Sequence, residues 1–126
     1  MQSSEQGFSL LELMYIVLIL GILAATSVSL YKGFKQTTYE TTVQQDIRNT
    51  ALICESYYAE SQVYPTFGPF TGTQSHSNFT IAPRHIIRIS KGVTVQAVRL
   101  PDNTVNLIGT HPGTSQGFQY IRHLGF

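Results

Sequence analysis

The sequence has little of the residue types that build cross-linked, metal-bound or highly charged proteins. It contains a single cysteine, Cys54, which excludes an intramolecular disulfide and any zinc or iron–sulfur site built on several cysteines. Charged residues make up 12% of the 126 residues, about half the usual share of a soluble domain. Lys and Arg total 8 against 7 Asp and Glu, a balance that gives no reason to expect a nucleic-acid-binding protein. We therefore expect one small domain, part of which does not face water.

Residues 8–30 form a long apolar run that contains one charged side chain, Glu12. A helix needs about 20 apolar residues to cross a bilayer, so the run is long enough. A signal peptide has a basic start and a shorter apolar stretch, whereas residues 1–7 contain no Lys or Arg. A helix buried in a soluble core is also disfavoured, because the remaining chain is too small to enclose it. We predict a transmembrane segment over residues 8–30.

Glu12 is energetically unfavourable in such a segment, because a lone carboxylate in a membrane carries a large desolvation cost. Two explanations are open. Glu12 lies near the interface and reaches water, or it meets a positive charge inside an assembly. Residues 8–31 contain no basic side chain. In the second case the cation would come from a chain terminus or from another subunit.

Residues 7–13 read GFSLLEL and precede an apolar run that includes Gly21, Ala24 and Ala25. This pattern resembles the processing motif of type IV pilins, in particular the type IVa major pilins, and of the related pseudopilins. The resemblance implies that residues 1–7 are a prepilin leader and that a prepilin peptidase cleaves after Gly7. It implies that the same enzyme methylates the new amine of Phe8, and that Glu12 neutralises the Phe8 amine of a neighbouring subunit. The implied filament core is the 8–30 segment, including Leu10, Leu11, Leu13, Ile16 and Leu20.

Two features depart from this family pattern. Residues 1–6 lack the usual basic residues, while Lys32 and Lys35 lie on the other flank of the apolar run, which argues mildly against a cytoplasmic N-terminus. Processing requires the leader to face the cytoplasm, so that orientation is kept. Ser29 stands where many pilins have a helix-kinking proline.

Residues 31–63 have the apolar period of an amphipathic helix. The apolar stripe consists of Val43, Ile47, Ala51, Cys54 and Tyr58. Four charged residues fall outside it: Asp46, Arg48, Glu55 and Glu60. Tyr64-Pro65 is a stop signal, and no proline precedes it. The sequence therefore allows one continuous helix from about Phe8 to Ser61.

The remainder of the chain changes character at Tyr64. Residues 64–83 contain three of the five prolines, with Gly, Ser and Thr, and are predicted to be a connecting loop. Residues 84–126 show short alternating runs separated by turn residues, which predicts an antiparallel β-sheet head. Its strands are expected at 84–89, 93–98, 104–108 and 118–124. The sheet should cover the apolar stripe of the helix, giving an α+β fold that also fits the resemblance to pilins.

Signs of catalysis are weak. The sequence contains no P-loop, dinucleotide-binding or nucleophile-elbow motif, and its histidines have no metal-ligand spacing. We interpret them as surface, turn or sheet residues: His76, His85, His111 and His123. Cys54 lies on the helix stripe and is expected to be a small buried hydrophobe. Asn78-Phe79-Thr80 fits a glycosylation sequon, a match that also arises by chance. We expect no enzyme, no cofactor and no metal site.

Charge and aromatic side chains are distributed unevenly. Residues 8–63 hold three basic against five acidic residues, and residues 64–126 hold five basic residues against Asp102 alone. The basic residues either meet acidic surfaces of adjacent subunits, which we favour, or offer weak, repeated contact to DNA or other anionic surfaces. Core packing and subunit contacts explain the helix aromatics, and electron conduction is a further hypothesis. These aromatics are Tyr31, Phe34, Tyr39, Tyr57, Tyr58 and Tyr64.

The expected function is structural. The chain would reside in the bacterial inner membrane as a single-pass prepilin and then, with the pilus assembly machinery, polymerise with itself into an extracellular helical filament. Such a filament would serve adhesion, motility, DNA uptake or surface contact. The main alternative is a pseudopilin of a type II secretion system. A single-pass anchor that does not polymerise is a third interpretation, but it leaves Glu12 and the processing motif unexplained.

Overall fold

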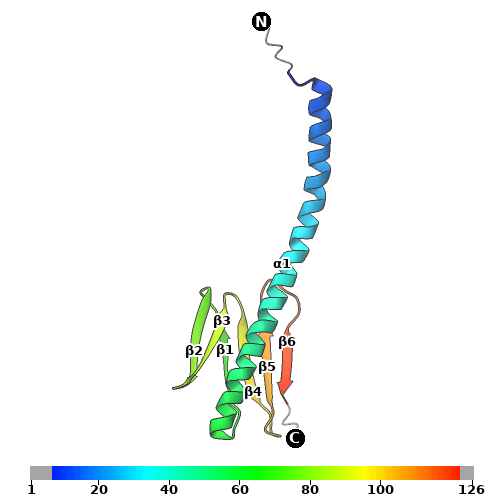
Figure 1. Ribbon diagram of the computed structural model, residues 1–126. Helices are drawn as coiled ribbons and strands as arrows, with labels where there is room; N and C mark the ends of the chain where they lie inside the picture. Colours follow the sequence, from blue (N-terminus) through cyan, green and yellow to red (C-terminus); the bar gives the residue numbers. More distant parts are fainter. Residues whose placement is uncertain (1–6, 123–126) are drawn as a thin grey trace. The chain divides into compact units, whose positions relative to one another are not determined.

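The computed structural model describes residues 7–122 of the chain. One helix, α1 (Leu10–Ser61), is followed by six strands (Figure 1). The strands are β1 (Phe67–Thr71), β2 (His76–Ala82), β3 (His85–Ser90), β4 (Thr94–Arg99), β5 (Val105–Thr110) and β6 (Phe118–Arg122). The expected α+β class is confirmed, and so is a continuous helix that ends at Ser61.

The chain divides into two compact units, residues 1–35 and 36–126. The first contains the start of α1. The second, which we call the head, contains the rest of α1 and all six strands. The second half of α1 and the strands therefore belong to the same unit. Within that unit the strands can cover the apolar stripe of the helix.

The head contains two antiparallel sheets. Four strands follow the order β1-β4-β5-β6, and β2 and β3 form a separate two-stranded sheet. Within the head, α1 crosses the strands, with β2 and β3 to one side of it and β6 to the other (Figure 1). The expected strands at 84–89, 93–98, 104–108 and 118–124 correspond to β3 through β6, although residues 123 and 124 lie outside the described part. The expectation of a single sheet is wrong for β3, which pairs with β2.

The core forms where the helix stripe meets the sheets. Val43, Ile47, Ala51 and Cys54 are buried as predicted, and Tyr58 packs against them partly buried. The strands contribute alternate residues, as a period of two requires: Ile87, Ile89, Val95, Ala97, Val105 and Leu107. Val93, just before β4, is buried with them. In β3 the inward residues His85, Ile87 and Ile89 are buried and the intervening Ile86 and Arg88 are exposed.

The prediction that residues 64–83 form a connecting loop is wrong, because they contain β1 and β2. The register of β1 against β4 is interrupted between Phe67 and Phe70, and Pro69 lies in that interruption on the edge of the four-stranded sheet. A proline is tolerated there because an edge strand has a backbone side without a partner. The glycine and proline content of residues 64–83 therefore led to the wrong prediction of a loop.

The placement of Asp46 outside the buried stripe is also wrong. Asp46 is 5% exposed. Its carboxylate accepts hydrogen bonds from the Ser90 backbone N–H at 2.8 Å and from the Ser90 hydroxyl at 3.1 Å. Ser90 ends β3, so this polar contact ties the helix to the two-stranded sheet. A buried carboxylate is tolerated because hydrogen bonds replace part of its hydration.

Candidate functional site

The start of α1 is built by a reciprocal pair of hydrogen bonds between Ser9 and Glu12. The Ser9 backbone N–H donates to Glu12 Oε2, and the Glu12 backbone N–H donates to Ser9 Oγ, both at 3.2 Å. The Ser9 carbonyl also accepts the first helical hydrogen bond, from Leu13 N at 3.2 Å. This is a capping box, in which Ser9 is the N-cap and Glu12 the third helical residue. It satisfies backbone donors that a helix start otherwise leaves unpaired.

The capping box changes the expectation for Glu12. Residues 8–31 contain no basic side chain that could pair with its carboxylate, but a backbone N–H can also be a partner. In the single chain one carboxylate oxygen already accepts a backbone hydrogen bond from Ser9. This bond carries no opposite charge, so a cation would still gain from approaching Glu12.

Gly7 and Phe8 precede the helix and are exposed. A Cβ added to Gly7 would have no neighbouring atom within 4 Å. The chain itself therefore has no packing requirement for glycine at position 7. Phe8 is 81% exposed, so the Gly7–Phe8 bond lies in accessible, non-helical backbone.

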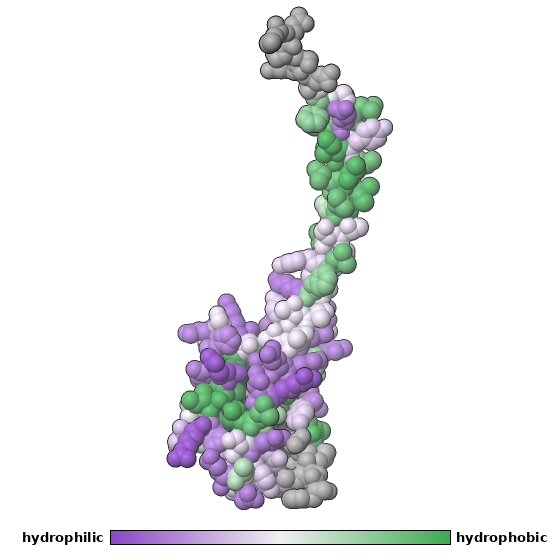
Figure 2. Space-filling view, in the orientation of Figure 1, coloured by the Kyte–Doolittle hydropathy of each residue, from purple (hydrophilic) through white to green (hydrophobic). Residues whose placement is uncertain are grey.

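The helix that follows presents apolar side chains on all sides within its own unit. The predicted filament-core residues are exposed to between 43% at Ile16 and 79% at Leu10, and the 8–30 stretch is strongly hydrophobic in Figure 2. Leu10, Leu13, Met14, Val17 and Leu18 line a shallow apolar hollow of about 310 Å³. The most apolar 18-residue window of α1 has a mean hydropathy of 2.4, so in length and composition α1 could span a membrane.

The hydroxyl groups of Thr26 and Ser27 are satisfied by the helix itself. Thr26 Oγ1 donates to the Leu23 carbonyl at 3.0 Å, and Ser27 Oγ donates to the same carbonyl at 2.7 Å. Such bonds to the preceding turn let Ser and Thr enter an apolar environment without an unpaired donor. The stretch is therefore compatible with lipid or with the apolar surface of another helix.

The predicted helix aromatics do not share one environment. Tyr31 and Phe34 are exposed in the first unit, and Lys35 Nζ lies 5.9 Å from the centre of the Tyr31 ring. In the head, Tyr39 stacks on His111 with ring centres 4.1 Å apart. Tyr58 stacks on the buried Tyr64 at 4.6 Å. Each of these head contacts joins α1 to a segment beyond it and stabilises the head.

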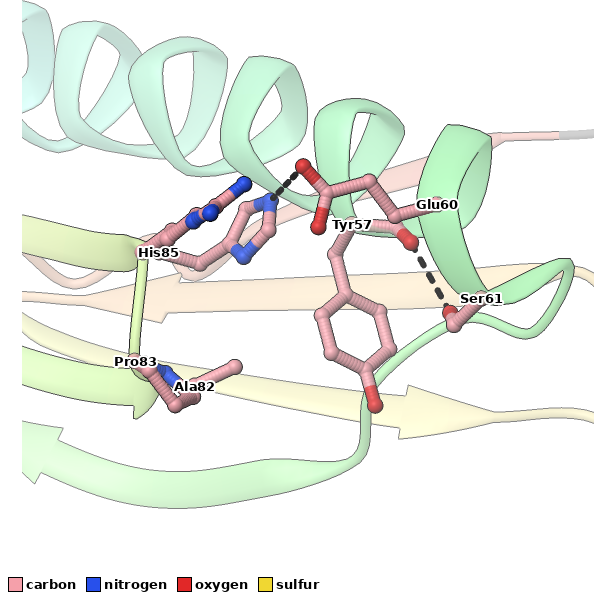
Figure 3. Close-up of a pocket in the computed structure, with 7 residues that line it drawn as sticks. Tyr57, Glu60, Ser61, Ala82, Pro83 and His85 are labelled. Carbon is pink, nitrogen blue, oxygen red and sulfur yellow. Dashed lines mark hydrogen bonds and ion pairs between the residues drawn. The ribbon is translucent and has the colours of Figure 1, made fainter.

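Tyr57 makes the third such contact, edge-on to His85 with ring centres 5.5 Å apart (Figure 3). Sequence reasoning did not foresee this pair, because it treated His85 as one of four scattered histidines. The alternation of residues 85, 87 and 89 in β3 would have placed His85 on the buried face, where it is 4% exposed.

Cys54 is fully buried, as predicted for a small hydrophobe. Burial, with a smaller contribution from the Glu55 charge, raises the pKa of its thiol to about 12. The thiolate that nucleophilic or redox chemistry requires is therefore essentially unpopulated at neutral pH. Among residues 7–122 no group of three or more His, Cys, Asp or Glu could hold a metal ion.

The basic residues of the head are spread over its surface. The exposed ones are Arg84, Arg88, Lys91 and Arg99. They come from the β2–β3 turn, from β3 and its end, and from the end of β4. The side chain of Arg122 and all of His123 lie outside the described residues. His76 and His111 are a strand and a turn residue, in agreement with the sequence interpretation.

Two fimbrial proteins from Pseudomonas aeruginosa are similar to this chain. Each is 28% identical over 107 residues, which cover 85% of this chain and 68% of the relative. The similarity and the long apolar helix together support a pilin-like protein. No protein-family model matches the sequence, and no solved structure matches it.

Proposed function

We propose that this chain is the structural subunit of a type IV pilus, made as a prepilin and polymerised into a helical surface filament. The observation that carries the proposal is the apolar surface of α1 over residues 10–30, which is exposed within its own unit among the described residues. Exposed apolar patches of this extent mark membrane or protein contacts. The similarity to fimbrial proteins favours a fibre over a monomeric anchor.

Processing would occur between Gly7 and Phe8. The support is the exposed, non-helical backbone at this bond, together with a glycine that the chain's own packing does not require. Recognition of Gly7 by a prepilin peptidase would explain why glycine stands at this position. N-methylation of Phe8 would follow at the new amine.

Assembly would move the apolar surface from lipid into a bundle of α1 helices from many subunits. In that environment the Glu12 carboxylate would meet the Phe8 amine of an adjacent subunit, which supplies the cation that Ser9 does not. Breaking a buried ion pair by removing one partner is far more costly than losing a surface pair. The pair would therefore select the axial position of each incoming subunit.

The proposal places the unassembled chain in the inner membrane, where the prepilin peptidase and the assembly machinery act, and the polymer outside the cell. The subunit is structural and not an enzyme. The basic residues of the head would face acidic surfaces of neighbouring subunits, with weak contact to DNA or other anionic surfaces as a secondary role.

Imaging of cells that lack the gene tests the proposal. Loss of surface filaments, with recovery on complementation, is expected. Intact filaments together with failed protein secretion would instead identify a pseudopilin. Mass spectrometry of sheared filaments provides an independent check, because the subunit should begin with a methylated Phe8. A chain that still carries residues 1–7 in the filament would contradict the processing step.

A further inference from the structure

The apolar run of α1 ends at a short group of aromatic and basic side chains. Residues 31–35 read YKGFK and follow the apolar run directly. Tyr31 is 65% exposed and Phe34 is 70% exposed, and both lysines, Lys32 and Lys35, are exposed as well. All five residues belong to the first compact unit. We call them the boundary segment.

The rise of the helix places the boundary segment at the edge of a bilayer. Residues 10–30 cover about 30 Å at a rise of about 1.5 Å per residue, which is the thickness of a hydrocarbon core. The next five residues add about 7 Å, which matches the depth of the polar layer on one side of a bilayer. If residues 10–30 fill the hydrocarbon, the boundary segment lies among the phospholipid headgroups.

The side chains of the boundary segment have the chemistry that this layer favours. Tyrosine is enriched at membrane–water interfaces because its ring is apolar and its hydroxyl is polar. Lys35 Nζ lies 5.9 Å from the centre of the Tyr31 ring, so the helix holds an ammonium group beside that ring. A lysine side chain can keep its methylene stem on apolar surface while its charge reaches a phosphate.

The positive charge of the boundary segment has no acidic counterpart nearby in the sequence. Residues 13–39 contain no Asp or Glu, and no carboxylate among residues 7–122 pairs with Lys32 or Lys35. Glu40, the next acidic residue, accepts a hydrogen bond from Gln36. Two ammonium groups within one helical turn, at the level of the headgroups, attract anionic lipids more strongly than zwitterionic lipids.

We propose that the boundary segment is a binding site for anionic phospholipids. Lys32 and Lys35 contact the headgroup phosphates, and Tyr31 lies where the headgroups meet the acyl chains. The inference rests on the proposed function, in which the unassembled chain resides in a membrane. It adds a lipid partner and fixes the depth of the chain in the bilayer. The site is used only before assembly, because a subunit that joins a filament leaves the lipid.

The sequence contains no tryptophan, so one introduced tryptophan can report on the boundary segment alone. Tyr31→Trp in the full chain provides this reporter and keeps an interfacial aromatic side chain. The protein is reconstituted into vesicles of phosphatidylcholine and phosphatidylglycerol in equal amounts. In each sample one of the two lipids carries bromine atoms at a chosen depth of its acyl chain. Bromine quenches tryptophan fluorescence on contact, so quenching measures both the depth of residue 31 and the lipid beside it.

We expect bromine atoms near the headgroup to quench the Tyr31→Trp reporter more strongly than bromine atoms near the chain end. Phosphatidylglycerol should be preferred over phosphatidylcholine about three- to tenfold at low salt, and about 0.5 M salt should weaken the preference. Lys32→Gln combined with Lys35→Gln should abolish it. Arg84→Gln combined with Arg88→Gln is the matched control. It removes two positive charges from exposed residues of the head and should leave the preference unchanged.

The outcomes separate this inference from the proposed function. Equal quenching by the two lipids overturns the lipid site, and so does a preference that survives the double lysine variant or disappears in the double arginine control. Membrane residence stands in those cases. Quenching that is strongest at the chain end overturns the assigned depth. If alkaline carbonate extracts the chain from the vesicles and no brominated lipid quenches residue 31, the chain does not reside in a membrane and both proposals fail.

Discussion

At the scale of single residues, the buried Asp46 carboxyl couples the stability of the head to pH. Burial raises the pKa of its carboxyl above the ordinary value of 3.8, although the hydrogen bonds from Ser90 and the charge of His76 work in the opposite direction. The folded head therefore holds the Asp46 proton more tightly than the unfolded chain does. The corresponding stabilisation is fully present below pH 3.8, and it is lost as the pH rises through the folded-state value.

Asp46→Asn should remove this pH dependence without removing the contact. The amide oxygen can accept from the Ser90 N–H, and the amide NH2 can donate to the Ser90 hydroxyl. We expect the free energy of unfolding of Asp46→Asn to vary less between pH 3.5 and 7 than that of the wild type. Urea titrations over that range measure the difference.

Asp46→Ala is the informative comparison, because it leaves the Ser90 N–H without its acceptor. It should destabilise the head by about 1–3 kcal/mol at neutral pH. Equal pH profiles for wild type and Asp46→Asn would show that the buried carboxylate does not couple to folding.

The sequence could not reveal this role of Asp46. Its position beside the apolar stripe looked solvent-facing, since charged residues are rarely buried. Asp46 can be buried because its carboxylate accepts a hydrogen bond from the backbone N–H of Ser90, which lies 44 positions away in the sequence. A backbone donor that is distant in the sequence leaves no signature in local residue patterns. The helical spacing of the apolar stripe is a local pattern, and it predicts the burial of Val43, Ile47, Ala51 and Cys54.

At the scale of elements, Gly109 allows α1 to pack closely on β5. A Cβ at position 109 would lie 2.5–2.8 Å from side-chain atoms of Ile47 and 2.9 Å from Val43 Cγ1. Those residues are part of the core and have little room to move. The closeness of the helix to the sheet therefore depends on the absence of a side chain at this position.

Gly109→Ala should destabilise the head by about 1–3 kcal/mol, the usual cost of overpacking. Gly117→Ala serves as the control, because its Cβ would meet Thr110 Cγ2 at 3.4 Å, an ordinary contact. Urea unfolding of both variants separates the effect of crowding from the general effect of replacing glycine. A control variant as unstable as Gly109→Ala would argue against the packing explanation.

The two faces of β3 provide a second test of helix–sheet packing. Ile87 is 1% exposed and its neighbour Ile86 is 48% exposed. Ile87→Ala should cost about 2–5 kcal/mol, because it leaves a cavity in the core. Ile86→Ala removes the same atoms from the outer face and should cost much less. Thermal unfolding of the two variants compares them directly, and similar losses would refute the assignment of the faces.

Elements were predictable where their signal was periodic and long. The helix and strands β3–β6 follow from apolar spacing, as residues 85, 87 and 89 illustrate. β1 was missed because proline and glycine dominate its five residues, FGPFT. β2 did carry a signal, since Ser77, Phe79 and Ile81 alternate with the exposed His76, Asn78 and Thr80. The turn-forming residues around β2 outweighed that signal in the sequence interpretation.

At the scale of the whole molecule, one sequence has to suit two environments. The head completes its own core, while the apolar side chains of residues 10–30 are exposed within their own unit. A hydrophobicity profile predicts the second property. It cannot predict how the single charge in that segment is held, because the capping box depends on the backbone geometry at Ser9.

Glu12 therefore combines two roles that substitutions can separate. Gln at position 12 retains the capping box, which accepts Glu or Gln, but lacks the charge. Leu lacks both. Ser9→Ala keeps the charge and removes the hydroxyl that accepts the Glu12 N–H, at a cost of about 1 kcal/mol to the helix start.

If the charge pair with the Phe8 amine drives polymerisation, Glu12→Gln and Glu12→Leu should both be cleaved and inserted in the membrane, yet yield few or no filaments. Ser9→Ala should assemble nearly normally, because its carboxylate is still charged. Filament yield after shearing, with immunoblots of the membrane fraction for the cleaved subunit, measures both steps. The opposite order, with Glu12→Gln assembling and Ser9→Ala failing, would mean that helix capping is what assembly requires. Normal yield from Glu12→Leu would mean that apolar packing alone suffices, and the charge pair would then have no part in the mechanism.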